Sequence, residues 1–233
     1  MALLLLAGGP PAAPQASAPR LPLEEIVRQF AEKENAYAGA HGLYSYRLTV
    51  RVQELGEGNR VLGEFEQVGE VSFDPSGRRL MRLLENPRTD LIRLSIARVE
   101  LTDLEFVPLF VLRPENVSKY DITYLTRERV DEVETYLFRL KPKDVVRAPE
   151  EHFEGIVYID TEQLDVVRAH GKLLPVRGGG VFGDYFKTVE LYREPVEGHL
   201  FTTFVRADDV LSARGESIRI RLTLRFSNHV RVR

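Results

Sequence analysis

The stretch FEGIVYIDTEQLDVVRAHG, residues 153–171, reads as two β-strands joined by a turn at residues 160–163. Phe153, Val157 and Ile159 alternate onto one face of the first strand, as in an antiparallel strand with one face on a core. Ile156 and Tyr158 put apolar side chains on the other face as well. We therefore expect a hairpin in a sheet whose second face is also partly covered, most simply by a loop.

The period of two continues on both sides of this hairpin. Residues 44–52 alternate apolar and polar side chains, a turn at 56–59 leads into a strand over 61–73, and residues 217–226 alternate most regularly. Glycines at 63 and 69 indicate bends or bulges. Other strands are expected at 79–84, 120–125, 135–140, 184–192 and 199–206. The fold class predicted is mainly β, a strongly curved antiparallel half-barrel of about ten strands.

Residues 21–38 carry the clearest helical pattern. Acidic residues at 24 and 25 suit the first turn, and glycines at 39 and 42 are typical of a helix end. One apolar face should pack on the concave side of the sheet: Leu23, Ile26, Val27 and Phe30.

Residues 90–114 follow neither period. Within them the run FVPLFVL, residues 106–112, has no charge and is too apolar for an exposed loop. We expect this insert to lie like a lid over one opening of the curved sheet, on its concave side.

The start of the chain suggests export. Residues 1–20 combine a short leucine-rich run with an alanine- and proline-rich stretch, which fits the remnant of a secretory signal or a disordered tail. Residues 21–233 are expected to form a single β domain in the periplasm. Past residue 20 nothing approaches the ~20 apolar residues of a membrane span.

Composition argues against nucleic acid as the main partner, because the chain of 233 residues has a net charge of -3. The strongest local charge feature is an arginine ladder near the end of the chain. It suits either an anionic surface or a soluble outward strand face that is protected from edge pairing. The ladder comprises Arg219, Arg221, Arg225, Arg231 and Arg233.

Motifs for catalysis are missing from the sequence. The five histidines have no HxxxH spacing, there is no cysteine, and there is no GxSxG motif. The one metal-like grouping is Glu150, Glu151 and His152 with His170, which the hairpin would bring back near Glu154 and His152. These groups could hold a metal, or could simply form a solvated strand end. We predict no cofactor, no metal and no enzymatic activity.

This layout, and the passages at residues 120–143 and 153–175, resemble the LolA/LolB-like superfamily of periplasmic lipoprotein carriers. The resemblance implies a half-open β-barrel whose concave face, lidded by helices, accommodates acyl chains or another hydrophobic ligand. It also implies a basic residue that holds the lid closed, with Arg47 and Arg51 as equal candidates. The implied partners are a hydrophobic ligand or a lipoprotein, with an envelope protein as a further possibility.

The resemblance also suggests which residues form the site. The expected lining residues are Tyr44, Tyr46, Leu48, Phe65, Tyr136 and Phe138, and the expected lid residues are Phe106, Leu109 and Phe110. The alternative is a structural or protein-interaction module whose barrel is filled by its own side chains.

Overall fold

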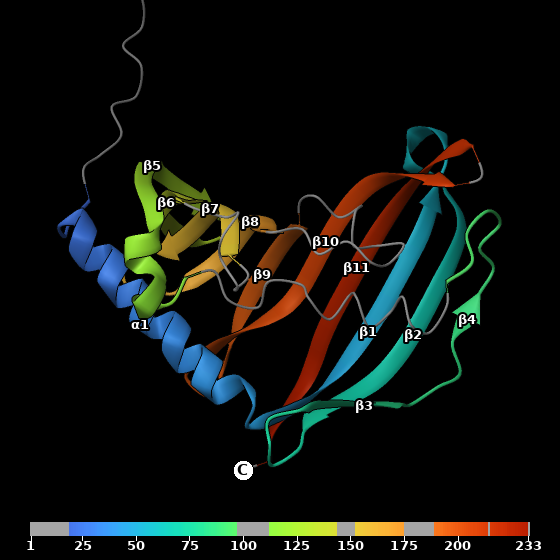
Figure 1. The fold of residues 1–233 in the computed structure, drawn as a ribbon, viewed down its shortest axis with the longest axis horizontal. Coiled ribbons are helices and arrows are strands. Elements are labelled where there is room, and N and C mark those ends of the chain that lie inside the picture. Colours follow the sequence, from blue (N-terminus) through green and yellow to red (C-terminus); the bar gives the residue numbers. More distant parts are fainter. Residues whose placement is uncertain (1–18, 97–111, 144–151, 175–188, 214, 233) are drawn as a thin grey trace, which may run out of the picture.

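The computed structural model describes residues 19–96, 112–143, 152–174, 189–213 and 215–232. Within these residues it contains one α-helix, two short 3-10 helices and eleven strands in one open sheet (Figure 1). The helices are α1 (Leu23–His41), η1 (Glu57–Asn59) and η3 (Pro114–Lys119). The strands are β1 (Tyr44–Leu55), β2 (Val61–Phe73), β3 (Arg79–Leu83), β4 (Arg88–Thr89), β5 (Tyr120–Val130), β6 (Val133–Pro142), β7 (His152–Asp160), β8 (Val166–Leu174), β9 (Val189–Val196), β10 (His199–Ala213) and β11 (Glu216–Arg231). The mainly β, half-open antiparallel fold predicted from the sequence is confirmed.

The sheet consists of two meanders joined in its middle. Strands β5 to β11 follow each other in chain order, β11 then pairs with β1, and β2 and β3 continue to the other edge. In the joining ladder Val50 lies opposite Leu224. Sequence alternation predicted the individual strands, but not this pairing of the first strand with the last.

Helix α1 begins after Pro22 and has Glu24 and Glu25 in its first turn. On its exposed side Arg28 pairs with Glu25 and Glu32, each at 2.6 Å. The helix continues to His41 and is capped by Gly42, one of the two glycines expected at its end, so it passes through Gly39 and beyond the predicted last residue 38. Tertiary contacts outweigh the poor helix propensity of glycine here, because residues on both sides of Gly39 are buried.

The helix packs on the inner face of the sheet largely as predicted. Ile26, Val27 and Phe30 are in the core, and the Phe30 ring lies 6.2 Å from that of Phe138. Leu23 was wrongly placed there, since it is 42% exposed. It is the first residue of the helix and precedes Ile26, the first one to be fully enclosed.

The hairpin β7–β8 has the two faces that its sequence implied. Phe153, Val157 and Ile159 are buried in the core, whereas Ile156 and Tyr158 are half-buried on the outer face. There the guanidinium of Arg168 lies 4.8 Å from the centre of the Tyr158 ring. Part of the second apolar face is therefore covered by an arginine side chain.

Strand β2 has the predicted irregularity next to Gly63, whereas its ladder with β1 runs in register through Gly69. The register with β1 shifts between Glu54 and Leu55, next to Gly63. A Cβ at Gly63 would lie 2.7 Å from the carbonyl oxygen of Asp90 and 3.0 Å from the Cα of Leu91. The missing side chain leaves room for the chain that follows β4.

The connection from β4 to β5 runs from one edge of the sheet to the other. Strand β4 pairs with β2 near one edge, and β5 forms the opposite edge. The described ends of this connection both join the core on the inner face: Leu91, Leu94 and Ile96 at one end, Leu112 and Val117 at the other. The remaining residues of the connection, 97–111, lie outside the described part of the chain.

Candidate functional site

The inner face of the sheet contains every lining residue proposed from the sequence. Each of the six side chains is buried. Five belong to the main core cluster: Tyr46, Leu48, Phe65, Tyr136 and Phe138. Tyr44 belongs instead to a smaller cluster with Tyr37, Ala40 and Phe201 at the C-terminal end of α1. The structure thus brings five of the six together and separates Tyr44 from them.

The inner face has two halves with different cover. Helix α1 runs beside the half formed by β5 to β9, where Tyr136 and Phe138 lie, and β1, β2 and β11 extend away from it (Figure 1). Most inner side chains of this second half are aliphatic and buried: Val50, Val52, Val71, Ile218, Ile220, Leu222 and Leu224. The same face also buries the aromatic Tyr46, Phe65 and Phe226 and the polar Glu54 and Gln67. Described residues that pack into the same cluster include Leu91, Leu94 and Ile96.

The carboxylate of Glu54 anchors residues 90–96, the covering segment of this half. Glu54 follows Val50 and Val52 in the inward phase of β1 and is completely buried. Its carboxylate accepts hydrogen bonds from three backbone N–H groups. The N···O distances are 3.3 Å to Ile92, 2.8 Å to Arg93 and 2.7 Å to Leu94. The Arg93 guanidinium lies 3.6 Å away and partly balances the charge. A charged anchor at the rim of an apolar face fixes where the segment enters that face.

A second buried charge joins α1 to the sheet. Arg193 on β9 forms a bidentate pair with Glu34 of α1, with 3.1 Å between Nη2 and Oε2. Its guanidinium carbon lies 4.9 Å from the centre of the Tyr37 ring. Both charged side chains are almost fully enclosed, so either one would be strongly destabilising without the other.

The end of α1 is packed in aromatic rings. His41 is buried and lies 5.1 Å from the ring of Phe73 and 5.7 Å from that of Tyr46. Burial, reinforced by His229, Arg79 and Arg193, lowers the pKa of His41 from 6.5 to about 4. The neutral imidazole is therefore part of the packing at neutral pH.

The basic residues singled out from the sequence lie elsewhere. Arg47 and Arg51 are on the exposed face of β1, and Arg51 pairs with Glu66 at 2.5 Å. Neither lies on the face that a lid would cover, because their positions alternate with those of the buried Leu48 and Val50.

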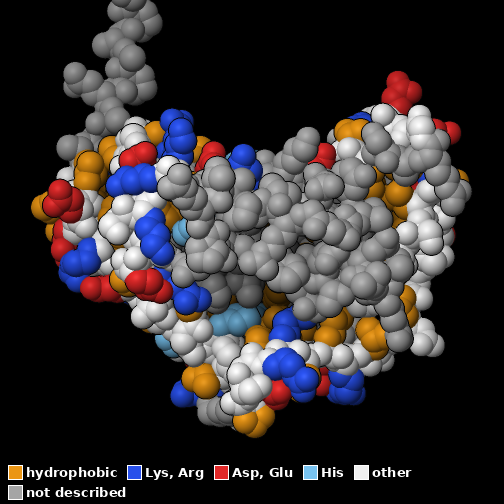
Figure 2. Space-filling view, viewed as in Figure 1, with side chains coloured by type: hydrophobic (Ala, Val, Ile, Leu, Met, Phe, Trp, Pro, Cys, Tyr) orange, Lys and Arg blue, Asp and Glu red, His pale blue; other side chains and the backbone are white. Residues whose placement is uncertain are grey.

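The arginine ladder on β11 is largely tied to its own surroundings. Arg221 pairs with Asp208 at 2.8 Å, Arg219 donates to the Asn59 side chain, and Arg225 lies over the Phe204 ring. Positive and negative side chains alternate over the visible surface at the α1 end of the molecule (Figure 2). The described part of the ladder thus fits a solvated strand face better than a site for anions.

Of the metal grouping considered from the sequence, Glu150 and Glu151 lie outside the described residues, and His152 and His170 are not brought together. His152 is buried against the ring of Tyr120, whereas His170 is exposed. Within the described ranges, no three His, Asp or Glu side chains lie close enough to hold a metal ion. The expected lid residues Phe106, Leu109 and Phe110 lie outside the described residues, and of the run 106–112 only Leu112 is described.

Sequence reasoning missed Glu54, Glu34 and Arg193. The signal for Glu54 and Arg193 was a charge in the inward phase of an alternating strand, after Val50 and Val52 in one case and after Val189 and Leu191 in the other. Glu34 occupies the next position after Phe30 on the apolar face of the helix. Such interruptions indicate buried charge pairs or anchors.

These features define an open antiparallel half-barrel with an apolar inner face, a helix over one half and an anchored segment over the other. No helix in the described part of the chain is long and apolar enough to cross a membrane. No family model matches the chain, and no curated protein matches it.

Several solved structures match the chain, and one of them is a protein of the superfamily that the sequence resembles. A DUF1329 family protein from Desulfovibrio piger is 14% identical over 86% of this chain and 92% of its own, with a TM-score of 0.40. A LolA superfamily protein from Nitrosomonas europaea is 13% identical over 90% and 93%, with a TM-score of 0.36. A candidate outer membrane lipoprotein-sorting protein domain from Vibrio parahaemolyticus is 10% identical over 88% and 90%, with a TM-score of 0.39. At these identities the likeness is one of overall fold.

Proposed function

We propose that this protein is a non-enzymatic, exported binding protein or carrier that holds a hydrophobic ligand, such as a lipid or an acyl chain, on the inner face of its sheet. The observation that carries the proposal is the largely apolar inner face of β1, β2 and β11, which extends beyond α1 and beneath a segment anchored through Glu54. An apolar surface with a separate cover suits an apolar ligand, because displacing the cover exposes binding area without unfolding the sheet.

The lining residues in this proposal are the predicted ones on the inner face. Leu48 and Phe65 lie on β1 and β2, in the half away from α1, and Tyr46 lies between that half and the aromatic cluster at the end of α1. Tyr136 and Phe138 lie under the helix. A ligand that displaces the cover would therefore meet Leu48 and Phe65 first, and would reach Tyr136 and Phe138 only if α1 moved.

Hydrogen exchange tests the cover directly. The amides of residues 92–96 should exchange faster than those of 217–226 in β11, and adding a long-chain lipid should slow them. Glu54→Ala should speed both exchange and lipid uptake, because it removes the anchor. Glu70→Ala on the exposed face of β2, where Glu70 pairs only with Arg82 among the described residues, is the matched control.

Native mass spectrometry of the purified protein supplies an independent test. Co-purified lipid supports a carrier. A ligand-free mass, together with protection at 92–96 equal to that of 217–226 and unaffected by lipid, would contradict the proposal. The protein would then be better explained as an interaction module whose inner face is filled by its own side chains.

Export rests on the composition of residues 1–20. Mass analysis of protein taken from its native host should find a new N-terminus between Ala13 and Leu21. Recovery of the full-length chain from the cytosolic fraction would refute this part of the proposal and leave ligand binding to be judged separately.

A further inference from the structure

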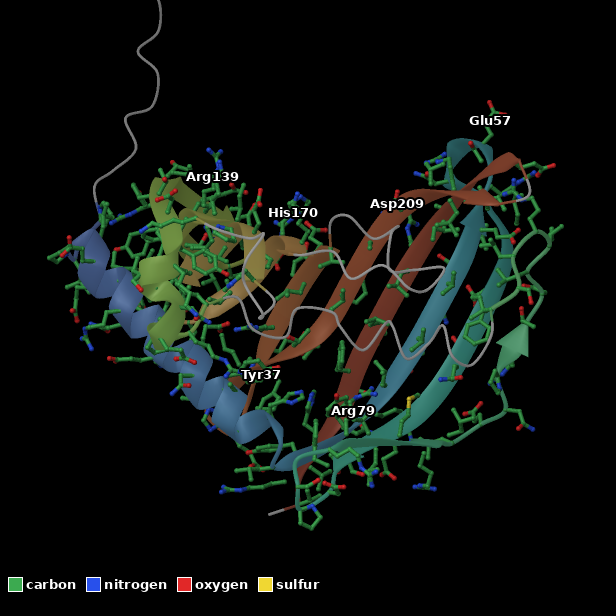
Figure 3. All side chains as sticks on the ribbon, in the orientation of Figure 1. Tyr37, Glu57, Arg79, Arg139, His170 and Asp209 are labelled. Carbon is green, nitrogen blue, oxygen red and sulfur yellow. The ribbon has the colours of Figure 1, made fainter. Side chains whose placement is uncertain are left out.

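A shallow groove crosses the outer face of β6, β7 and β8, on the side of the sheet away from α1. It has a volume of about 320 Å³. Arg139, Ile156 and His170 form one row across the three strands, and Glu154 and Lys172 are partners in the next row, beside Lys141. Figure 3 shows Arg139 and His170 in the upper part of the picture, with α1 below them.

The alternation of β6 explains why these side chains point outward. Phe138 and Leu140 are buried in the core beneath α1. Arg139 and Lys141 alternate with them and are exposed on the opposite face. The groove therefore lies on the other side of the sheet from the proposed lipid-binding face.

The three cations of this groove have no partner among the described residues, unlike most of the other described basic side chains. Arg139, Lys141 and Lys172 have neither an ion pair nor a side-chain hydrogen bond within the part of the chain that the structure describes. By contrast Arg82, which is more than two-thirds exposed, pairs with Glu70 at 2.5 Å. In the groove three cations accompany one carboxylate, Glu154, so positive charge is in excess.

Protection of a sheet edge does not account for these charges. Edge strands often carry lysine to prevent pairing with other chains, but β6, β7 and β8 are interior strands. The groove floor also contains the half-buried Ile156, followed along β7 by Tyr158. An apolar floor beside cations that no described residue pairs with suits a ligand that joins an anionic group to an apolar part.

We propose that this groove is a docking site for the phosphate-bearing head groups of anionic lipids at a membrane surface. Neighbouring strands are about 4.8 Å apart and alternate residues about 6.7 Å apart, so the three long side chains can converge on one phosphate. The guanidinium of Arg139 can donate two parallel hydrogen bonds to phosphate oxygens, and the ammonium groups of Lys141 and Lys172 add positive charge on flexible side chains. An acidic peptide fits less well, because interior strands have no unpaired backbone groups for an added strand.

Vesicle co-sedimentation tests this site with the full protein. Wild type should bind vesicles of phosphatidylcholine and phosphatidylglycerol in equal parts and should not bind phosphatidylcholine alone. The double variant K141Q/K172Q should bind the anionic vesicles about 30-fold more weakly, at roughly a factor of five for each lysine removed. The matched control R82Q/R88Q removes the same charge from exposed cations that already have acidic partners. It should bind like wild type.

Each contrary outcome identifies what is wrong. Equal losses in both double variants would show general electrostatic attraction and overturn the site, as would no binding by wild type. If inorganic phosphate or oligoglutamate binds wild type as tightly as the vesicles and K141Q/K172Q abolishes that binding, the ligand is a free phosphate or an acidic protein, and the lipid assignment is wrong. Circular dichroism melting of both variants separates any loss of folding from loss of binding.

This inference does not depend on the inner face. Uptake of a neutral lipid into the sheet should be the same in wild type and K141Q/K172Q. Loss of head-group binding with retained uptake would sustain both proposals, whereas vesicle binding without any uptake would sustain the outer groove alone.

Discussion

Glu54 on β1 and Gly63 on β2 are direct partners across the sheet, and both act on the same short stretch of chain, residues 90–94. Gly63 leaves space for the backbone of Asp90 and Leu91. The Glu54 carboxylate accepts hydrogen bonds from the backbone amides of the next residues, 92–94. One residue therefore permits the approach of the covering segment, and the other holds it.

Removing the Glu54 anchor should loosen the cover. Glu54→Ala should lower the free energy of unfolding by about 3 kcal/mol or more, because three backbone amides and Arg93 lose a charged partner in a buried place. Chemical denaturation measures the loss. The exposed Glu70→Ala should change stability by less than about 1 kcal/mol. Equal effects of the two substitutions would mean that Glu54 is not an anchor.

Filling the space at Gly63 should separate the segment from the sheet. In Gly63→Ala the new Cβ meets backbone atoms at 2.7 and 3.0 Å, which cannot rotate away, so we expect a loss of about 1–3 kcal/mol. Gly39→Ala is the matched control because its Cβ would meet nothing within 4 Å in a helix, and it should stabilise by about 0.5–1 kcal/mol. Thermal melts compare the two, and a neutral Gly63→Ala would refute the close approach.

The pair of Arg193 and Glu34 should behave as one unit. Arg193→Met alone should cost about 3–5 kcal/mol, because Glu34 is left buried without its partner charge. The double variant R193M/E34L should recover most of that loss, since both charges are gone. A double-mutant cycle by denaturant unfolding gives the coupling. Additive single effects would contradict the buried pair, and Arg82→Met supplies the value for an exposed pair.

Stability should fall as the solution becomes acidic, in part through His41. Its pKa in the folded protein is about 4, against 6.5 for the ordinary side chain. Above pH 6.5 neither the folded nor the unfolded state gains a proton, and the full stability is present. As the pH falls from 6.5 to about 4, the unfolded state alone takes up the proton, and stability on the order of 3 kcal/mol is lost.

Urea unfolding across this range measures the effect. His41→Phe should keep the aromatic packing and remove this part of the pH dependence, whereas the exposed His170→Gln should retain the wild-type profile. The groups that face His41 are His229, Arg79 and Arg193, so R193M should change the slope less than His41→Phe does. If His41→Phe has the same slope as wild type, another group is responsible.

The sequence by itself determined the local structure. Regular alternation in residues 44–52 and 217–226 predicted β1 and β11, because a strand with one buried face must repeat every second residue. The apolar spacing of Ile26, Val27 and Phe30 predicted both the helix and the face that it buries. Five of the six proposed lining residues fall in one buried cluster for the same reason, since inward phase alone places a side chain on the inner face. Their role in lining a ligand site stays a prediction.

Tertiary structure decided what these elements pack against. The pairing of β1 with β11 depends on contacts such as Val50 with Leu224, which no local period encodes. The extension of α1 through Gly39 depends on burial of Tyr37, Ala40 and His41 against strands far away in sequence. Burial beneath distant residues also gave Glu54 and Arg193, which look like ordinary charges in the sequence, their structural roles. Glu54 holds the backbone of the covering segment, and Arg193 pairs with Glu34 of α1. Periodicity fixes the face on which a charge lies, but its partner and its energy are set by the residues that fold over it.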